Sequence, residues 1–214
     1  MPKGSPPRAD ANLLVHQQRS GSVLIAGAPV TIAGPETAKA LGMGFVTEDR
    51  KQTGLVLDFP IRANTALPSQ GRLARFGMAS LARETSLARE TIARLNIRCT
   101  GPEQWVGGLS GGNQQKVVLG KWLATAPRVL LLDEPTRGID VGAKQEVYGL
   151  IERLKEAGVA ILLVSSELPE LLRLADRILV MCEGRPTGLL ERAAATQERI
   201  MELAAPKALG GRAA

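Results

Sequence analysis

Residues 109–116 read LSGGNQQK, and residues 130–140 read LLLDEPTRGID. The first string is a glycine-rich turn that opens a helix, so its backbone N–H groups and the positive helix end point at one place, where a phosphate binds well. The second string is an apolar strand that ends in two adjacent carboxylates, Asp133 and Glu134. Such a pair suits a magnesium ion and an attacking water. Together the two strings indicate phosphate chemistry on a fold of strands and helices.

Short apolar strands alternate with amphipathic helices around the second string. We expect strands at residues 43–46, 129–132, 159–164 and 177–181, and helices at residues 143–157 and 168–174. This alternation is typical of a parallel sheet that is covered by helices on both faces. Ligands gather at the carboxyl ends of such strands, where Asp133 and Glu134 stand. The sequence therefore predicts an α/β fold.

The rest of the chain is expected to complete one domain. The other expected elements are a hairpin at 22–32, a short helix at 35–41, a charged loop at 47–54, a helical segment at 61–98 with a break at 68–71, a turn at 183–185 and a terminal helix at 193–204. The domain is expected to span residues 21–205, with a helical subdomain at about residues 60–125. Residues 1–20 are expected to be disordered, and residues 206–214 to form a loose tail.

The composition excludes several classes of protein. The chain has 214 residues, 44% of them hydrophobic, so it can bury a large core. It has no run of about 18 apolar residues and no signal-peptide pattern, which favours a cytoplasmic location. His16 is the only histidine, so histidine-based catalysis and metal binding are disfavoured, and Cys99 and Cys182 are expected to be free thiols. The net charge of +6 comes with arginines interspersed with glutamates, which indicates solvated helix faces rather than a nucleic-acid surface.

Each string has a plain alternative when it is taken alone: a serine-capped helix start for the first, and exposed strand-end acids for the second. In this order they resemble the ATPase of ABC transporters, with its signature motif, its Walker B strand and its D-loop. The resemblance implies an incomplete P-loop NTPase (RecA-like) core of parallel strands with an inserted helical subdomain. It also implies that Asp133 holds magnesium through water, and that Glu134 is catalytic and polarises the water that attacks the γ-phosphate.

The same resemblance implies a nucleotide-contacting surface at the start of the signature helix. In the family, this surface closes over the γ-phosphate held by the P-loop of a facing subunit, and not over the nucleotide of its own subunit. The residues expected to contact the nucleotide are Ser110, Gly111, Gly112, Gln114, Glu48 and Asp140. Glycine lets the backbone approach a phosphate closely, and Ser110 adds a hydroxyl donor.

Glu48 and Ser166 narrow the resemblance to one group within the family. Residues 48–51 read EDRK after a buried strand, and they resemble the second ATPase half of ribose-, galactose- and xylose-type sugar importers; a solvated charge run is the alternative for this loop alone. Glu48 stands where most members place the glutamine of the Q-loop, which couples the site to membrane subunits, and it is a second expected magnesium ligand. Ser166 stands where most members have the switch histidine. It is expected to act in catalysis as a hydrogen-bond donor with a shorter reach.

The chain contains no G-x-x-x-x-G-K-[ST] string, the P-loop that holds the β- and γ-phosphates. In the family, the string seen here at residues 20–27 follows the P-loop helix closely, which places the P-loop lysine or arginine at or just before Met1. We therefore expect a lost or misplaced upstream segment and weak ATP binding by the chain alone. We also expect apolar surface to be left open where the P-loop strand is absent.

The implied function is the ATP-hydrolysing subunit of a carbohydrate importer, or a fragment of it. Its cofactors are ATP and Mg²⁺, bound weakly or contributed by a partner subunit. The implied partners are a first-half ABC ATPase domain, membrane permease subunits and, indirectly, a periplasmic sugar-binding protein, at the inner face of the cell membrane. No nucleic acid is expected. One alternative is a non-catalytic interaction module or pseudogene product. Another is a soluble ABC protein acting on ribosomes or nucleic acid, which the EDRK string and Ser166 disfavour.

Overall fold

The computed structural model describes residues 21–74 and 80–205. They belong to two compact units, Met1–Leu162 and Leu163–Ala214. The predicted disorder of residues 1–20 and the predicted tail at 206–214 lie outside the described residues, as do residues 75–79 of the predicted helical segment. Within the described ranges, no helix is both long enough and apolar enough to cross a membrane.

The first unit begins with an antiparallel hairpin of β1 (Val23–Ile25) and β2 (Ala28–Val30). Ala26 and Gly27 form its turn with φ angles of 52° and 78°, the left-handed conformation that a tight hairpin turn needs. The helix α2 (Pro35–Ala40) follows and starts with its proline, which presets the helical φ angle. Both elements confirm the predictions for this part of the chain.

The central sheet contains β3 (Met43–Val46), β4 (Val129–Asp133) and β5 (Ala160–Val164), in the order β3-β4-β5. β3 and β4 run parallel, with Phe45 opposite Leu131. Leu130 and Leu132, which alternate with Leu131 along β4, are buried on one face. The predicted parallel sheet is confirmed, and β4 ends at the first of the two adjacent carboxylates.

Apolar side chains of β5 face solvent. Leu162 and Val164 are 58% and 54% exposed, although strands of parallel sheets are usually covered on both faces. The sequence predicts open apolar surface of this kind from the absence of a P-loop strand. Such surface favours association with another protein segment.

Helices gather between β3 and β4 in the chain. They are α3 (Ile61–Ala66), η2 (Leu67–Ser69), α4 (Gln70–Leu73), α5 (Leu81–Leu95), η3 (Val106–Gly108) and α6 (Gly111–Leu123). The predicted break corresponds to η2, a single 3₁₀ turn at Pro68. α5 ends at Leu95, before the predicted end at residue 98, because Asn96 takes a left-handed φ of 48° and caps the helix.

The prediction of a charged loop at residues 47–54 is wrong for its second part. The segment Arg50–Gly54 forms a π-helical turn, η1. Asp49 nucleates this turn because its Oδ1 accepts hydrogen bonds from the backbone N–H groups of Lys51 and Gln52, both at 3.0 Å. The charged side chains therefore project from a fixed backbone rather than from a free loop.

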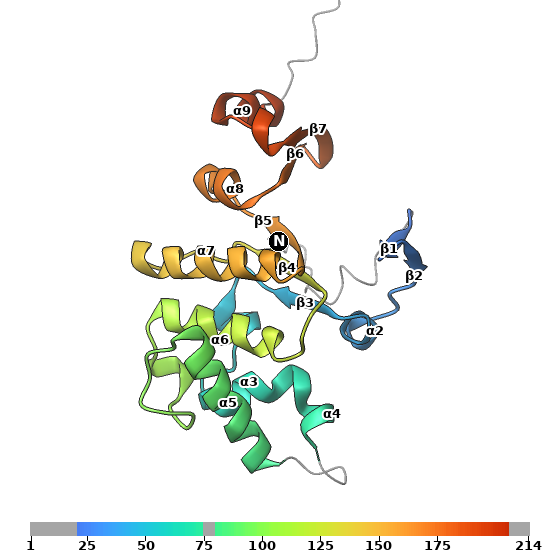
Figure 1. The fold of residues 1–214 in the computed structure, drawn as a ribbon. Coiled ribbons are helices and arrows are strands. Elements are labelled where there is room, and N and C mark those ends of the chain that lie inside the picture. The colour runs from blue at the N-terminus through green and yellow to red at the C-terminus, as the bar shows by residue number, and fades with distance from the viewer. Residues whose placement is uncertain (1–20, 75–79, 206–214) are drawn as a thin grey trace, which may run out of the picture. The chain divides into compact units, whose positions relative to one another are not determined.

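The helix α6 is the centre of the first unit. Ten of its thirteen residues are buried, and it packs against α3, α5, β3 and α7 (Val141–Glu156). Figure 1 shows α6 between α7 on one side and the α3 and α5 pair on the other. A helix that is covered on every side must satisfy its polar residues internally. Lys116 does so by donating to Asn96 O at 2.8 Å and by pairing with Glu146 of α7.

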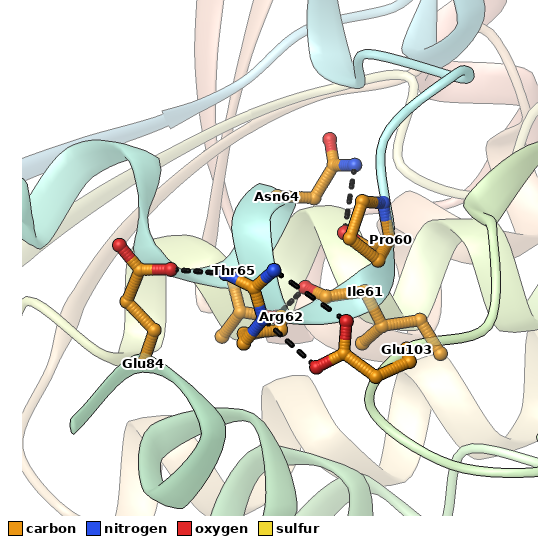
Figure 2. Close-up of polar contacts among 7 residues, drawn as sticks. All are labelled: Pro60, Ile61, Arg62, Asn64, Thr65, Glu84 and Glu103. Carbon is orange, nitrogen blue, oxygen red and sulfur yellow. Dashed lines mark hydrogen bonds and ion pairs between the residues drawn. The ribbon is translucent and has the colours of Figure 1, made fainter. Parts of the chain in front are cut away.

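Two polar side chains of α3, the buried Asn64 and the partly buried Arg62, fix the segments around this helix. Asn64 accepts a hydrogen bond from the backbone N–H of Val56 and donates to the carbonyl oxygens of Val56, Phe59 and Pro60. Arg62 reaches Glu84 on one side and Glu103 on the other (Figure 2), at 2.5 and 2.9 Å. The Asn64 bonds hold residues 56–60 against α3, and the Arg62 ion pairs join α3 to α5 and to the segment at Glu103.

The second unit consists of α8 (Leu168–Leu174), β6 (Arg177–Cys182), β7 (Arg185–Glu191), η4 (Arg192–Ala194) and α9 (Gln197–Ala204). Its core forms around Ile178, Val180 and Ile200. β6 pairs antiparallel with β7, a strand that the sequence analysis missed. The predicted terminal helix at 193–204 is shorter than expected, because Thr196 caps α9 by accepting from Arg199 N.

Candidate functional site

Two adjacent carboxylates stand at the carboxyl end of β4. Burial raises the pKa of Asp133, and the negative charge of Glu134 raises it further. Glu134 takes a left-handed φ of 46°, which is uncommon for a residue other than glycine and typical of functional turns. The backbone therefore holds two mutually repelling carboxylates side by side.

This pair fits a magnesium ion that is held mainly by water and phosphate oxygens. Among the described residues, no group of three or more histidine, cysteine, aspartate or glutamate side chains is arranged to hold a metal. Mg²⁺ commonly uses one or two carboxylates and completes its shell with water and substrate phosphates, so an all-protein cage is not needed. The raised pKa of Asp133 is what a nearby cation would relieve. A bound ion would neutralise phosphate charge here.

The signature tip, residues 110–112, opens α6. Ser110 is exposed, and its Oγ accepts a hydrogen bond from Asn113 Nδ2 at 2.9 Å. Asn113 is fixed in turn because its Oδ1 accepts from Arg98 N at 2.9 Å. As an acceptor in this contact, the Ser110 hydroxyl keeps its own hydrogen to donate. Serine and the first helical N–H groups thus present donors at a positive helix end.

Gln114 lies beneath this tip rather than on it. Its side chain is 4% exposed, and its Nε2 donates to Val106 O at 3.2 Å. The expected contact between Gln114 and the nucleotide stays a prediction. The placement favours an indirect role, in which the amide fixes the chain just before the tip.

The tip is wedged against the loop that follows β4. A Cβ atom on Gly111 would lie 2.8 Å from Arg50 Nη2 and 3.2 Å from Gly138 O. A Cβ atom on Gly112 would lie 2.5 Å from Ala143 Cβ. A larger residue at Gly112 would overlap Ala143, and one at Gly111 would have to displace the Arg50 guanidinium and would crowd Gly138 O. The structure thus brings the signature tip against residues 137–140 of the second string, called the D-loop string below.

Asp140 lies next to the tip as the N-cap of α7. Its Oδ1 accepts from Ala143 N at 2.9 Å, and its Oδ2 would lie 3.9 Å from a Cβ atom on Gly112. The capping bond fixes the start of α7 beside the signature helix. The sequence analysis expected Asp140 at the nucleotide, which stays a prediction; the structure gives it a capping role within the same cluster.

Glu48 is engaged by a partner that the sequence analysis did not consider. It forms an ion pair with Arg137 of the D-loop string. To ligate magnesium, as expected from its Q-loop position, Glu48 would have to give up this pair. The sequence analysis assigned no role to Arg50 or Arg137. Only their positions inside the strings EDRK and DEPTRGID could have pointed to one.

Lys121 anchors the other end of the same loop. It is a buried residue of α6, and its Nζ donates to Gly54 O at the end of η1. Burial lowers the pKa of Lys121 from its ordinary value of 10.5 to about 8. The ammonium group is therefore kept in the core at a cost in stability.

The lowered pKa of Lys121 predicts that the free energy of unfolding rises at alkaline pH. Between pH 8 and 10.5 the unfolded chain binds a proton at Lys121 that the folded chain has lost, so the free energy of unfolding rises with pH over this window. The rise amounts to about 3 kcal/mol at most. Urea unfolding of the wild type and of Lys121→Met, at several pH values, isolates the difference. Parallel curves for the two proteins would contradict the prediction.

Ser166 belongs to the second unit. It follows β5 in a turn where Ser165 Oγ accepts from Glu167 N at 3.0 Å, just before α8 begins. Its expected catalytic role stays a prediction from the sequence.

The comparison with known proteins decides the family. The model of the ABC transporter family matches residues 11–137, which include the signature string and the carboxylate pair. The chain belongs to the ABC transporter family. The match begins at residue 11, within the segment that the sequence analysis expected to be disordered.

Curated relatives and solved structures agree with this assignment. The chain is 51% identical over 190 residues to the "Ribose import ATP-binding protein RbsA" of Lactococcus lactis subsp. cremoris SK11, covering 89% of this chain and 39% of the relative. It is 51% identical over 185 residues to the RbsA protein of Bacillus subtilis 168, covering 86% of this chain and 38% of the relative. The chain thus spans less than half the length of these relatives.

Two solved ATP-binding cassettes share the fold. MJ0796, in a dimeric post-hydrolysis state bound to ADP and Pi, gives a TM-score of 0.66 at 23% identity, covering 81% of this chain and 74% of that one. MJ1267, in its ADP conformation, gives a TM-score of 0.66 at 19% identity, covering 86% of this chain and 72% of that one. The predicted α/β fold of a P-loop NTPase is confirmed.

Proposed function

We propose that the chain is the signature-bearing part of the ATP-binding subunit of a carbohydrate importer. The observation that carries this proposal is the signature tip, whose donors stand at a helix end and are fixed by Asn113 and by the D-loop string. The names of the ribose import relatives support sugar as the substrate class. The proposed place of action is the cytoplasmic face of the membrane.

In this function the tip completes the ATP site of a partner. The Ser110 hydroxyl and the N–H groups of Gly111 and Gly112 donate to the γ-phosphate that the partner's P-loop holds. Such preorganised donors stabilise the charge that develops on the phosphoryl group. Asp140 holds the start of α7 beside the tip, and Gln114 holds the segment before it. A first-half ABC ATPase domain is the proposed partner.

The carboxylate pair has a separate role, in the subunit's own site. Asp133 would hold magnesium through water, and Glu134 would orient and polarise the attacking water. The family resemblance gives Ser166 the separate role of a hydrogen-bond donor to the γ-phosphate. This site needs P-loop contacts that the 214 residues do not supply. We therefore expect ATP and Mg²⁺ to bind weakly to the chain alone. Isothermal titration with ATP·Mg²⁺ tests this, and micromolar affinity would contradict it.

An exposed apolar patch suits the proposed permease contact. Val56, Phe59 and Trp105 are 39%, 45% and 60% exposed. The bond from Val106 N to Phe59 O, at 3.1 Å, joins the two segments that carry these side chains. Asn64 fixes the first segment from below. This apolar surface, part of which follows η1 in the chain, supports docking of a membrane subunit, through which a periplasmic sugar-binding protein would act indirectly.

Mixing tests the proposed function. The purified chain is added in increasing amounts to a separately expressed ABC ATPase half that carries a P-loop, and phosphate release is measured. We expect hydrolysis to rise and to saturate as the chain completes the partner's site. If hydrolysis does not rise, the result contradicts this function and favours the non-catalytic interaction module.

A further inference from the structure

The 47–54 loop is attached to the rest of the first unit at three points. At its start, Glu48 pairs with the Arg137 guanidinium. At its end, Gly54 O accepts from Lys121. Between these points, Arg50 reaches across to the loop that follows β4. The Glu48 contact is an ordinary ion pair and the Gly54 contact is a single hydrogen bond. The Arg50 contact has a more demanding geometry.

Arg50 grips two consecutive carbonyl groups. Its Nη1 donates to Arg137 O at 2.7 Å and its Nη2 donates to Gly138 O at 3.0 Å. A guanidinium is a rigid planar fork, so it fixes the spacing and the direction of both acceptors at once. A lysine ammonium in the same place would bind one of them without fixing their geometry.

The same guanidinium also touches the signature tip. Its Nη2 lies 2.8 Å from the position of a Cβ atom on Gly111, so a larger residue there would displace the guanidinium. The Nε atom is buried and has no hydrogen-bond partner among the described residues. Burying Nε without a hydrogen bond is unfavourable, so the bonds at Nη1 and Nη2 must compensate for this cost to keep the guanidinium in place. Arg50 thus contacts the turn at Arg137 and Gly138 and, at the same time, the tip that packs against this turn.

We propose that Arg50 is a positioning residue for the signature tip. Its fork sets the distance between the tip and the 137–138 turn, and so the direction in which the N–H groups of Gly111 and Gly112 point. Because Arg50 sits in η1, between Glu48 and Gly54, any displacement of the 47–54 loop moves the fork and changes the tip. This inference rests on the proposed function for its consequence in ATP hydrolysis, but not for the structural coupling itself.

Hydrogen exchange tests the coupling without any ATPase activity. Amide exchange is measured by mass spectrometry in the wild type, Arg50→Ala, Arg50→Lys and the control Arg89→Ala, whose side chain is exposed on α5. We expect exchange in peptides covering residues 106–116 and 134–143 to accelerate about tenfold in Arg50→Ala, since two charge-assisted bonds are lost. Arg50→Lys should accelerate as well, and the control should not.

Chemical rescue separates positioning from a general loss of folding. Millimolar methylguanidinium is expected to slow exchange in Arg50→Ala toward the wild-type rate, whereas methylammonium at the same concentration is not. If Arg50→Ala does not fold, the same comparison is made in Arg50→Lys without rescue. Unchanged exchange at residues 106–116 in a folded variant overturns the inference.

The mixing experiment then tests the functional consequence. We expect Arg50→Ala to lower the maximal gain in hydrolysis about tenfold and to leave the partner's KM for ATP unchanged, because the tip acts in the transition state and not in ATP capture. A variant with the wild-type gain overturns the inference. Absence of a gain with the wild-type chain would count against the proposed function alone, since the exchange experiment still decides the role of Arg50.

Discussion

Replacing Gly111 with aspartate is expected to lower the ATPase gain of the mixture by on the order of a hundredfold. The new carboxylate would stand at the positive end of α6, where it repels the phosphate that the tip should bind. Its Cβ atom would also lie 2.8 Å from Arg50 Nη2, so the aspartate would draw the guanidinium away from the carbonyl of Gly138. Phosphate release over a range of chain concentrations measures the loss.

Gly108→Asp is the matched control for this prediction. It adds the same charge just before the tip, at an exposed glycine whose Cβ position has no heavy atom within 4 Å. An acidic residue at the first position of a helix usually stabilises it, so Gly111→Asp should still fold, and circular dichroism checks this. We expect the control to keep its gain within about twofold. Equal losses in both variants would point to charge alone and would contradict the role of the tip.

The fold class was predictable because it depends on local patterns. The alternation of apolar strands and amphipathic helices is written along the chain, and it gave β3 and α8 with the bounds that the structure has. β7 was missed because Pro186 and Gly188 interrupt its pattern. Proline is tolerated at a sheet edge, where its missing N–H is not needed, so tertiary pairing with β6 decided this strand.

The candidate site was predictable only where its residues are neighbours in sequence. Asp133 with Glu134, and Ser110 with Gly111 and Gly112, each form a local motif with a known chemistry. The contact of Arg50 with Gly138 joins residues that are 88 positions apart, and no periodicity in the chain encodes it.

Lys121 shows the same limit on prediction from the sequence. The Gly-Lys pair at 120 and 121 lacks the rest of a P-loop string, and nothing in the dipeptide indicates the structural role that burial on all sides of α6 gives the lysine. Whether a lysine faces solvent or the core depends on what packs around its helix. That information is held in the fold and not in the dipeptide.

The largest expected loss of stability from a single substitution comes from Gly120→Ala. Gly120 lies where α5 crosses α6, and a methyl group there would overlap Thr91 Cγ2 and approach Leu95 Cδ1 to 3.1 Å. Thr91 is not free to turn away, because its Oγ1 donates to Leu87 O at 2.8 Å. We expect a loss of about 1–3 kcal/mol in the free energy of unfolding, as for other overpacked cores. Urea unfolding followed by the fluorescence of Trp122, on the same helix, measures it.

The same substitution at Gly149 should act in the opposite direction. Gly149 also lies inside a helix, α7, but the nearest atom to its Cβ position is Arg153 Nη1 at 3.5 Å, the end of a flexible side chain. Alanine there restricts the unfolded chain and fits the folded one, so we expect a gain of roughly 0.5–1 kcal/mol. Helix propensity favours alanine equally at both positions, so the difference between the two variants isolates the contact between α5 and α6. Stabilisation of both variants would contradict the prediction, because it would mean that α5 and α6 leave room for a methyl group at position 120.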